Sequence, residues 1–200
     1  MRIIFVTGGV RSGKSAYALS QAQTLPGKKA FIATARALDD EMRERIEAHK
    51  RQRNNVWNTY EEPIKIAELI DELKSRYDVI LIDCLTMWLS NVMHAGLDVI
   101  QEIDKLVGAT LAVAHRQGQA LPLHLSQQVA GRGNPRDCPQ AGASPAPAIF
   151  IVSNEVGMGI VPENPLARQF RDYQGILNQH IAGIADEVYL MVASIPVRIK

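Results

Sequence analysis

Cysteine is scarce in this chain, which has 2 cysteines among 200 residues. Cys84 and Cys138 stand far apart, and neither belongs to a closely spaced pair of the kind that binds metal. Small secreted folds held together by disulfides need several cysteines, and structural zinc sites need cysteines or histidines at short spacings. The scarcity excludes both classes and predicts a protein of the reducing cytoplasm.

An excess of charge of one sign is also missing, since 22 Lys and Arg stand against 21 Asp and Glu. Proteins that bind nucleic acid or anionic membranes usually carry a basic excess, so we expect neither partner. No apolar run approaches the roughly 18 residues of a membrane span, and the N-terminal run is too short for a signal peptide. We expect no transmembrane segment and one α/β domain over residues 1–200, a length that suits a single core.

One short stretch, residues 8–15, carries a complete phosphate-binding pattern. Its letters GGVRSGKS fit G-x-x-x-x-G-K-[ST]. The apolar run at 3–6 predicts a buried strand before the stretch, and the pattern over 15–25 predicts a helix after it. We interpret strand, glycine turn and helix in this order as a nucleoside triphosphate site. The alternative is a glycine-rich turn that happens to contain a lysine.

The residue types in this stretch suit the chemistry. Gly8 and Gly13 allow backbone conformations in which successive N–H groups point at phosphate oxygens near the positive end of the helix. Lys14 would lie beside the β- and γ-phosphates, and the hydroxyl of Ser15 would bind Mg²⁺. We therefore expect phosphate recognition to be local, because the chain has no global positive field.

Polar residues follow further predicted strands. The apolar run at 30–33 leads into residues 34–36, the run at 79–82 ends at Asp83, and Glu155 follows a later strand in the same way. Residues just beyond the carboxyl ends of strands line the crevice where open α/β sheets bind ligands. We interpret Asp83 as a Mg²⁺ or nucleotide ligand, with a helix cap as the alternative. For residues 34–36, nucleotide contact and an ordinary connecting loop both stay open.

A histidine lies in the helical pattern that opens at Asp39. Met42, Ile46 and His49 fall at i, i+4 and i+7, which predicts that the histidine shares a face with two apolar residues and points inward. An inward histidine is more often a core residue with satisfied hydrogen bonds than a catalyst. Spacing alone leaves both roles open.

The second half of the chain contains two more apolar runs and an irregular segment. Runs at 148–153 and 188–192 predict strands, and periodic patterns predict helices over 98–116 and 165–184. Residues 117–147 are rich in Gly, Pro, Ala, Ser and Gln and show no sustained period. We expect a long surface loop there, and no residue in it indicates a chemical role.

Four strings in this order resemble a known family. They are TGGVRSGKS at 7–15, FIATARALDDEMRERIEAHKRQR at 31–53, LIDCLTMWLSN at 81–91 and IVSNEVGMGIVPENPLARQFRD at 151–172. Together they are similar to the bifunctional adenosylcobinamide kinase/adenosylcobinamide-phosphate guanylyltransferases of cobalamin biosynthesis. The string NEVGMGIVPEN at 154–164 is far more distinctive than the phosphate-binding pattern.

The resemblance implies two reactions. Enzymes of this family phosphorylate the aminopropanol hydroxyl of adenosylcobinamide with a nucleoside triphosphate, then attach GMP from GTP to give adenosylcobinamide-GDP. The second reaction passes through a GMP-histidine, and the family's R-I-x-x-H pattern matches Arg45, Ile46 and His49. The implied catalytic residues are His49 and Lys14, the substrates adenosylcobinamide, adenosylcobinamide phosphate, GTP and ATP, and the cofactor Mg²⁺ at Ser15 and Asp83.

The resemblance also implies a fold and a set of contacts. The fold is a P-loop NTPase-type α/β domain of three layers, with a mostly parallel sheet, an antiparallel edge and assembly as a homotrimer. Residues 117–147 are longer than the family's usual connection. The implied nucleotide contacts are Gly8, Gly9, Val10, Arg11, Ser12, Gly13, Lys14, Ser15, Thr34, Ala35, Arg36, Lys50, Arg51, Gln52, Arg53, Glu61 and Asp83.

Two other functions stay open at this stage. The first is a P-loop kinase that acts on a small molecule in one reaction only, with His49 as a structural residue. The second is a nucleotide-binding switch without a small-molecule substrate. A covalent guanylyl adduct distinguishes the bifunctional enzyme from the first, and stimulation of nucleotide turnover by cobinamide distinguishes it from the second.

Overall fold

Seven strands form one sheet in the part of the chain that the structure describes. The computed structural model describes residues 2–36, 40, 44, 56–114 and 147–200. The strand order is β3-β2-β4-β5-β1-β6-β7, and all neighbours are parallel except β6 and β7. This confirms the expected parallel sheet with an antiparallel edge. The strands are β1 (Arg2–Gly8), β2 (Lys29–Ala33), β3 (Trp57–Glu61), β4 (Val79–Asp83), β5 (Ala148–Val152), β6 (Glu187–Val192) and β7 (Ile195–Arg198).

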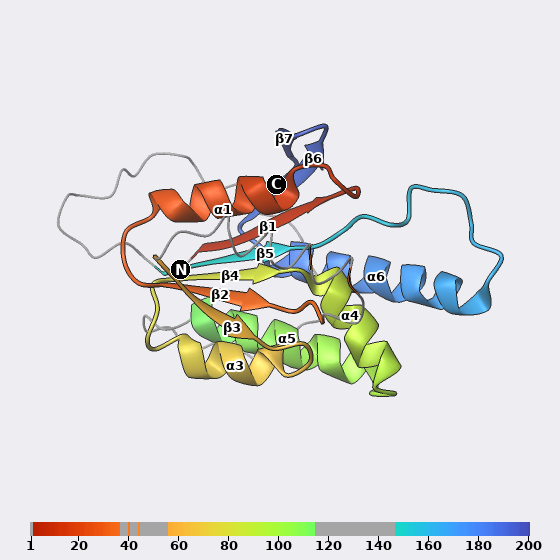
Figure 1. Cartoon of the computed structure of the whole chain (residues 1–200), viewed down its shortest axis with the longest axis horizontal. Coiled ribbons are helices and arrows are strands. Elements are labelled where there is room, and N and C mark those ends of the chain that lie inside the picture. The colour runs from red at the N-terminus through yellow and green to blue at the C-terminus, as the bar shows by residue number, and fades with distance from the viewer. Residues whose placement is uncertain (1, 37–39, 41–43, 45–55, 115–146) are drawn as a thin grey trace, which may run out of the picture.

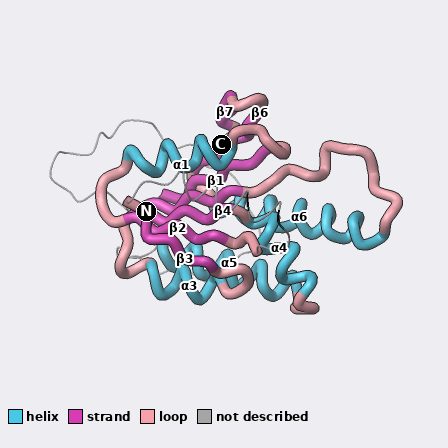
Figure 2. The backbone as a smooth tube through the Cα atoms, in the orientation of Figure 1, coloured by secondary structure: helices cyan, strands magenta, loops and turns pink. Residues whose placement is uncertain are grey.

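Helices cover both faces of the sheet. The described helices are α1 (Lys14–Thr24), α3 (Ile66–Leu73), α4 (Leu85–His94), α5 (Val99–Ala114) and α6 (Pro165–Ile184). Helix α1 lies on one face, and α3, α4, α5 and α6 lie on the other (Figure 1 and Figure 2). Helix, sheet and helix form the three layers that the family resemblance implies.

The central strands are hydrophobic along their whole length because both of their faces are covered. In β1, Ile3 and Phe5 pack with the four-helix layer, whereas Ile4 and Val6 pack under α1. The residues of β5 alternate in the same way. Successive side chains of a strand point to opposite faces of the sheet, so every second residue packs against the same helix layer.

Local signals explain where α6 begins. Asn164 is its N-cap, and the side-chain oxygen accepts hydrogen bonds from the N–H groups of Leu166 (2.8 Å) and Ala167 (3.3 Å). Pro165 follows at the first helical position. A backbone N–H at that position has no acceptor within the helix, so the missing N–H of proline costs no hydrogen bond there. A long segment connects β5 to this helix and carries its start well away from the sheet (Figure 1).

Several predicted features fall outside the described residues. They include the helix with His49, Lys50, Arg51, Gln52 and Arg53, and all of the predicted loop except Pro147. Strand β7 was not predicted from the residue pattern, which ended at Val192. No helix in the described ranges combines the length and apolar composition that crossing a bilayer demands.

Candidate functional site

The carboxyl ends of the parallel strands meet at one edge of the sheet. Glu61, Ala33, Asp83, Val152 and Val6 form one row across β3, β2, β4, β5 and β1. Residues paired across neighbouring strands face the same side of a sheet, and Val6 and Val152 pack under α1. The side chains of Asp83 and Glu61 therefore share the face of the sheet on which α1 lies.

The loop between β1 and α1 has the geometry of an anion site. Gly13 is the N-cap of α1 and has a left-handed φ of 88°. The first hydrogen bond of the helix runs from Tyr17 N–H to the Gly13 carbonyl (2.9 Å). The N–H groups of Lys14, Ser15 and Ala16 therefore have no acceptor inside the helix, and they lie at its positive end. This arrangement suits phosphate oxygens.

The hairpin of β6 and β7 contacts this loop. Its turn, Ala193 and Ser194, has positive φ angles of 49° and 66°, as a two-residue turn of type I′ requires. The N–H of Ser194 donates to the Ser12 carbonyl (2.9 Å). The Ser12–Gly13 peptide is trans and planar, so the Gly13 N–H points away from the hairpin. The hairpin thus fixes the direction of one N–H of the phosphate-binding loop.

Both glycines of the pattern are needed for this close approach. A Cβ on Gly13 would lie 2.7 Å from the Ser194 Oγ and 3.2 Å from its Cα. A Cβ on Gly8 would lie 2.6 Å from the Met191 carbonyl oxygen. The sequence predicts the two glycines from phosphate binding alone. The close packing of the β6–β7 hairpin against Gly8 and Gly13 is a second reason why these positions need glycine, and no local sequence pattern indicates it.

Lys14 and Asp83 are brought together from two different strands. Lys14 is buried, and its Nζ donates to the Gly9 carbonyl (2.8 Å). Burial lowers the pKa of Lys14, while its electrostatic interactions with Cys84 and Asp83 act in the opposite direction. Phosphate oxygens next to Nζ would favour the charged form further. The fold therefore brings Lys14 near Asp83, the last residue of β4, and the phosphate and Mg²⁺ roles of the two residues stay predictions.

Thr34 holds the backbone at the end of β4. Its Oγ1 donates to the Cys84 carbonyl (2.7 Å) and accepts from the Cys84 N–H (2.9 Å). The Asn91 side chain donates to the Thr34 carbonyl (2.8 Å), and Thr34 is wholly buried. The side chain therefore has a structural role that the sequence does not indicate. Its contact with nucleotide stays a prediction, as do those of half-buried Ala35 and exposed Arg36.

Cys84 is not set up as a nucleophile. Burial raises the pKa of its thiol to about 11, and the neighbouring Asp83 acts in the same direction. A thiol rather than a thiolate is present at neutral pH, and only the thiolate is a good nucleophile. The thiol therefore packs beside the site rather than reacting in it.

Glu61 lies at a distance from the phosphate-binding loop. Strand β3 is at the edge of the sheet and stands four strands from β1 in the order β3-β2-β4-β5-β1. At ~4.8 Å per strand, the two ends are about 19 Å apart. A ligand that contacts both Glu61 and the loop must therefore extend along the carboxyl edge of the sheet.

The donor set for a metal is small. Ser15 is half-buried in the first turn of α1, and Asp83 faces the same side of the sheet. Within the described ranges, no three His, Cys, Asp or Glu residues come together in a cluster that could hold a metal ion. Mg²⁺ usually binds one or two protein oxygens and completes its shell with phosphates and water. Ser15 and Asp83 fit Mg²⁺ bound together with a nucleotide.

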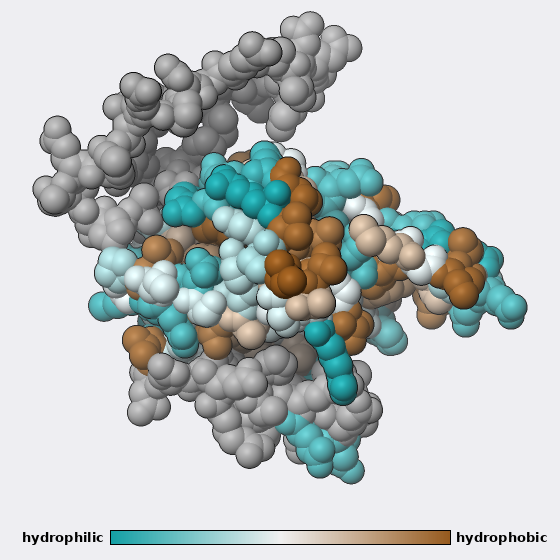
Figure 3. Space-filling view, turned by 90° about the horizontal axis from the view of Figure 1, so that it is seen from above, coloured by the Kyte–Doolittle hydropathy of each residue, from teal (hydrophilic) through white to brown (hydrophobic). Residues whose placement is uncertain are grey.

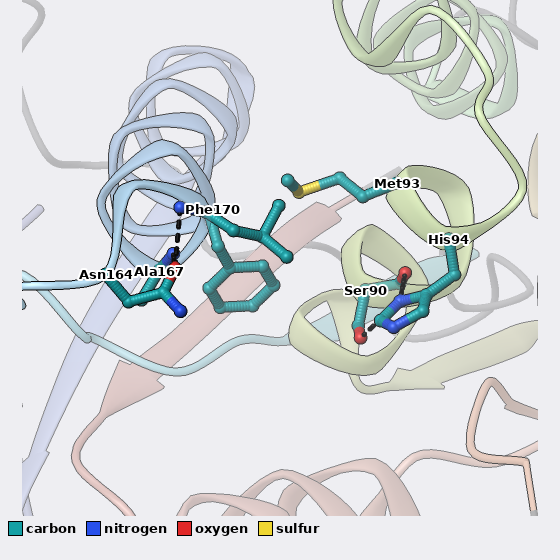
Figure 4. A pocket seen from close by; sticks show the side chains of 7 residues that line it. Ser90, Met93, His94, Asn164, Ala167 and Phe170 are labelled. Atoms are coloured by element: carbon teal, nitrogen blue, oxygen red, sulfur yellow. Dashed lines mark hydrogen bonds between the residues drawn. The ribbon is translucent and has the colours of Figure 1, made fainter.

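A separate cavity of about 470 Å³ lies between the end of α4 and the start of α6. Figure 4 shows Met93 and Phe170 extending into the space between the two helices. Nδ1 of His94 is 2.7 Å from the Ser90 carbonyl oxygen. None of the predicted nucleotide contacts lines this cavity. Its lining residues are Ser90, Met93, His94, Asn164, Leu166, Ala167 and Phe170.

Comparison with known proteins gives full-length matches. Residues 4–199 match the family model described as cobinamide kinase / cobinamide phosphate guanyltransferase. The chain is 37% identical over 203 residues to the bifunctional adenosylcobalamin biosynthesis protein CobU of Escherichia coli (strain K12), with 99% of each chain covered. Identity to the protein of that name from Salmonella typhimurium is 38% over 198 residues, again with 99% of each covered. The bifunctional protein CobP of Pseudomonas aeruginosa is 33% identical over 195 residues, which cover 98% of this chain and 95% of CobP.

Proposed function

The chain belongs to the cobinamide kinase / cobinamide phosphate guanyltransferase family, and on that premise we propose that it catalyses both reactions in cobalamin biosynthesis. In the first reaction, the γ-phosphoryl group of a nucleoside triphosphate passes to the aminopropanol hydroxyl of adenosylcobinamide. In the second, GMP from GTP joins the new phosphate to give adenosylcobinamide-GDP and pyrophosphate. We propose further that residues 1–200 form a single domain that works in the cytoplasm.

The observation that carries this proposal is the anion site at the start of α1, in a chain whose family match spans residues 4–199. The N–H groups of Lys14 and Ser15 have no acceptor in the helix, and the buried Lys14 interacts with Asp83. Phosphate oxygens can replace the Gly9 carbonyl as the acceptor for Lys14 Nζ. A triphosphate bound here has its charge offset by backbone dipoles and one lysine.

In the kinase reaction, the substrate hydroxyl oxygen attacks the γ-phosphorus in line, and the bond to the nucleoside diphosphate breaks. Lys14 and the loop N–H groups stabilise the charge that develops on the departing oxygens. Ser15 and Asp83 would hold Mg²⁺, which would supply further positive charge to offset that of the phosphates. The hydroxyl proton leaves to solvent.

In the guanylyl reaction, a neutral imidazole nitrogen of His49 attacks the α-phosphorus of GTP. The nitrogen–phosphorus bond forms as the bond to pyrophosphate breaks, and the phosphate of adenosylcobinamide phosphate then displaces His49. An imidazole with an ordinary pKa of about 6.5 is mostly neutral at pH 7. Nucleotide contacts by Thr34, Ala35, Arg36, Lys50, Arg51, Gln52, Arg53 and Glu61 belong to the same proposal.

We also propose that the chain assembles as a homotrimer. Large apolar side chains on β6 and β7 are exposed, and a hydrophobic area is visible on this side of the molecule in Figure 3. An exposed edge strand with apolar side chains invites pairing with another chain. The exposed residues are Val192, Ile195 and Val197, together with Ile199 just beyond the end of β7. Light scattering of Ile195→Lys should then give a smaller mass than the unchanged protein.

The proposed chemistry is tested with GTP labelled at the α-phosphate. We expect label on the protein, on His49, and its transfer to the corrinoid when adenosylcobinamide phosphate is added. His49→Ala should lose the protein label and keep γ-phosphoryl transfer to adenosylcobinamide, whereas Lys14→Ala should lose both. Corrinoid phosphorylation without any protein label would indicate the single-reaction kinase. Nucleotide hydrolysis that cobinamide does not change would indicate a switch.

A further inference from the structure

The chain continues in an extended conformation beyond the end of β5. The N–H of Ser153 donates to the Val6 carbonyl (3.0 Å), and the N–H of Glu155 donates to the Gly8 carbonyl (3.0 Å). These bonds continue the parallel ladder between β5 and β1 by one more residue pair. The direction of the side chains at 153 and 154 therefore follows the alternation of the strand.

That alternation directs Asn154 toward the phosphate-binding loop. The Ser153 Oγ accepts a hydrogen bond from the Gln174 side chain of α6 (2.9 Å), so Ser153 faces the four-helix layer. Asn154 must then face the opposite side, together with Val152, which packs under α1. Val152 pairs with Asp83, so Asn154 lies on the same face of the sheet as Asp83. Asn154 is two residues beyond Val152, which places it about 6.6 Å further along the direction of β5.

Strand β5 stands between the two strands that supply the predicted phosphate and metal ligands. In the sheet order it is flanked by β1, which leads into Lys14, and by β4, which ends at Asp83. Each neighbouring strand is ~4.8 Å away. A polar side chain at the carboxyl end of β5 is therefore placed between Lys14 and Asp83.

The backbone of Asn154 is fixed on both sides. Its N–H donates to the Thr86 Oγ1 (2.8 Å), and its carbonyl accepts from the Asn178 side chain (3.0 Å). The Gln174 side chain joins Asn178 (3.0 Å) to Ser153, and all three residues are buried. Buried polar groups are retained where hydrogen bonds satisfy them, and such a network fixes one arrangement. This network therefore fixes the backbone of Asn154 in one position.

The side chain of Asn154 itself is uncommitted among the residues that the structure describes. It makes no hydrogen bond to any of them, and the residue is half-buried. Its amide offers two N–H donors and a carbonyl acceptor, and it carries no charge that would repel phosphate. A donor of this kind suits an anionic oxygen, and its carbonyl suits a water molecule bound to a metal.

We infer that Asn154 is a phosphate-binding residue whose side-chain amide donates to the γ-phosphate of the bound nucleoside triphosphate. With the β-phosphate at the free N–H groups at the start of α1, Asp83 would hold Mg²⁺, which would supply positive charge to the phosphates. The γ-phosphate would then lie toward β4, over the end of β5. The inference rests on the proposed nucleotide site, and it gives a role to the string NEVGMGIVPEN that the proposed function leaves without one.

The test compares two ligands that differ in the γ-phosphate, GDP and a GTP analogue with a non-hydrolysable β–γ bridge, by calorimetry with Mg²⁺. We expect Asn154→Ala to weaken binding of the analogue roughly 10- to 100-fold, the loss typical of a hydrogen bond to a charged group, and binding of GDP less than about threefold. Asn154→Asp keeps the shape and adds a negative charge, so it should weaken binding of the analogue more. Asn58→Ala, the same change at an exposed position, is the matched control.

Equal affinity of the variants and the unchanged protein for the analogue overturns the inference, and so does an equal loss for both ligands. If the variants do not fold, labelled asparagine in the unchanged protein still decides the matter. Its Asn154 side-chain N–H resonances should shift with the analogue and stay near their free positions with GDP, and shifts of equal size with both ligands contradict the inference. Failure of corrinoid phosphorylation by the unchanged protein would count against the proposed function alone, because the binding comparison does not use the corrinoid.

Discussion

The two faces of the sheet differ in what they bury. The face under α3, α4, α5 and α6 buries a large apolar cluster, including Leu73, Leu85 and Trp88, and its buried polar side chains in the described ranges, such as Gln174, carry no charge. The face under α1 has a smaller apolar cluster and also buries charged groups, among them Lys14 and Glu187. Burial of apolar side chains stabilises a fold, whereas burial of charge costs free energy unless partners offset it. Stability and chemistry are therefore divided between the two faces.

Because of this division, substitutions that remove a similar number of atoms should have different effects on stability and turnover on the two faces. Removing a buried apolar group from the four-helix face should lower the free energy of unfolding and should not change turnover by the folded protein. Removing the buried charge of Lys14, which faces the proposed nucleotide site near α1, should change turnover and leave stability nearly unchanged. The following predictions test this division, beginning with the largest expected effect.

Lys14→Ala should lower kcat/KM of the kinase reaction roughly 10³-fold, or ~4 kcal/mol, because a preorganised charge near the transferred phosphoryl group is lost. The melting temperature should stay the same or rise, since burial of this lysine is unfavourable and lowers its pKa. Steady-state kinetics and calorimetry measure the two effects. Lys28→Ala, at an exposed position, is the control. A large drop in melting temperature would contradict the division.

Leu73→Ala should lower the free energy of unfolding by about 2–5 kcal/mol, because it leaves a cavity in the four-helix face. The side chain is fully buried in α3, away from the carboxyl edge of the sheet. Urea unfolding measures the loss, and kcat/KM measured at a temperature where the variant is folded should equal that of the unchanged protein. Leu97→Ala, at a partly exposed position, should cost less than about 0.5 kcal/mol.

Gly13→Ala should cost about 2 kcal/mol of stability, since its left-handed φ disfavours a side chain and the new Cβ meets Ser194. Unlike Leu73→Ala, it should also weaken nucleotide binding, because the hairpin must move away from the loop. Calorimetric titration with GDP measures this second effect. Gly108→Ala makes the same change inside α5 where no atom lies close, and it should raise stability. Unchanged GDP affinity in Gly13→Ala would show that the loop tolerates loss of the hairpin contact.

Glu187→Gln should have the smallest effect, about 1 kcal/mol, and only above acidic pH. Burial acts to raise the pKa of Glu187, but hydrogen bonds from Tyr189 (2.6 Å) and Arg2 outweigh it and lower the pKa. The same hydrogen bond raises the pKa of Tyr189 to about 12.

A lowered carboxyl pKa contributes stability above the unfolded value and loses it as pH falls through the folded value. The difference in free energy of unfolding between the two proteins should therefore shrink as pH falls below about 4. A difference that grows at low pH would mean that the native state favours the protonated carboxyl group instead.

Much of the fold could be predicted from the sequence because its central strands are unusually clear. Runs at 3–6, 30–33, 79–82, 148–153 and 188–192 lie in or overlap the strands β1, β2, β4, β5 and β6. Buried parallel strands are continuous hydrophobic runs, so they stand out without any knowledge of the fold. Strand β7 could not be found in this way, because it is short, fully exposed and contains Pro196.

The candidate site could be predicted where it depends on one local segment or on strand ends. Residues 8–15 are contiguous, and Asp83 ends a strand whose neighbours are parallel to it. The roles of Thr34 and Ser194 could not be predicted, because each depends on a backbone group of a residue distant in the sequence. The catalytic role of His49 came from family resemblance, and it remains a prediction outside the described residues.

The hydrogen bond between Ser194 and Ser12 has a consequence for synthesis of the protein. A ribosome makes Ser12 about 180 residues before Ser194, which at ~5–20 residues per second separates the two by roughly 10–40 s. The β6 strand beside β1 also arrives late. In a nascent chain that lacks Ser194, the phosphate-binding loop therefore does not yet have its hydrogen bond from the β6–β7 hairpin. A chain truncated just before Ser194 would retain most of the core and bind nucleotide weakly.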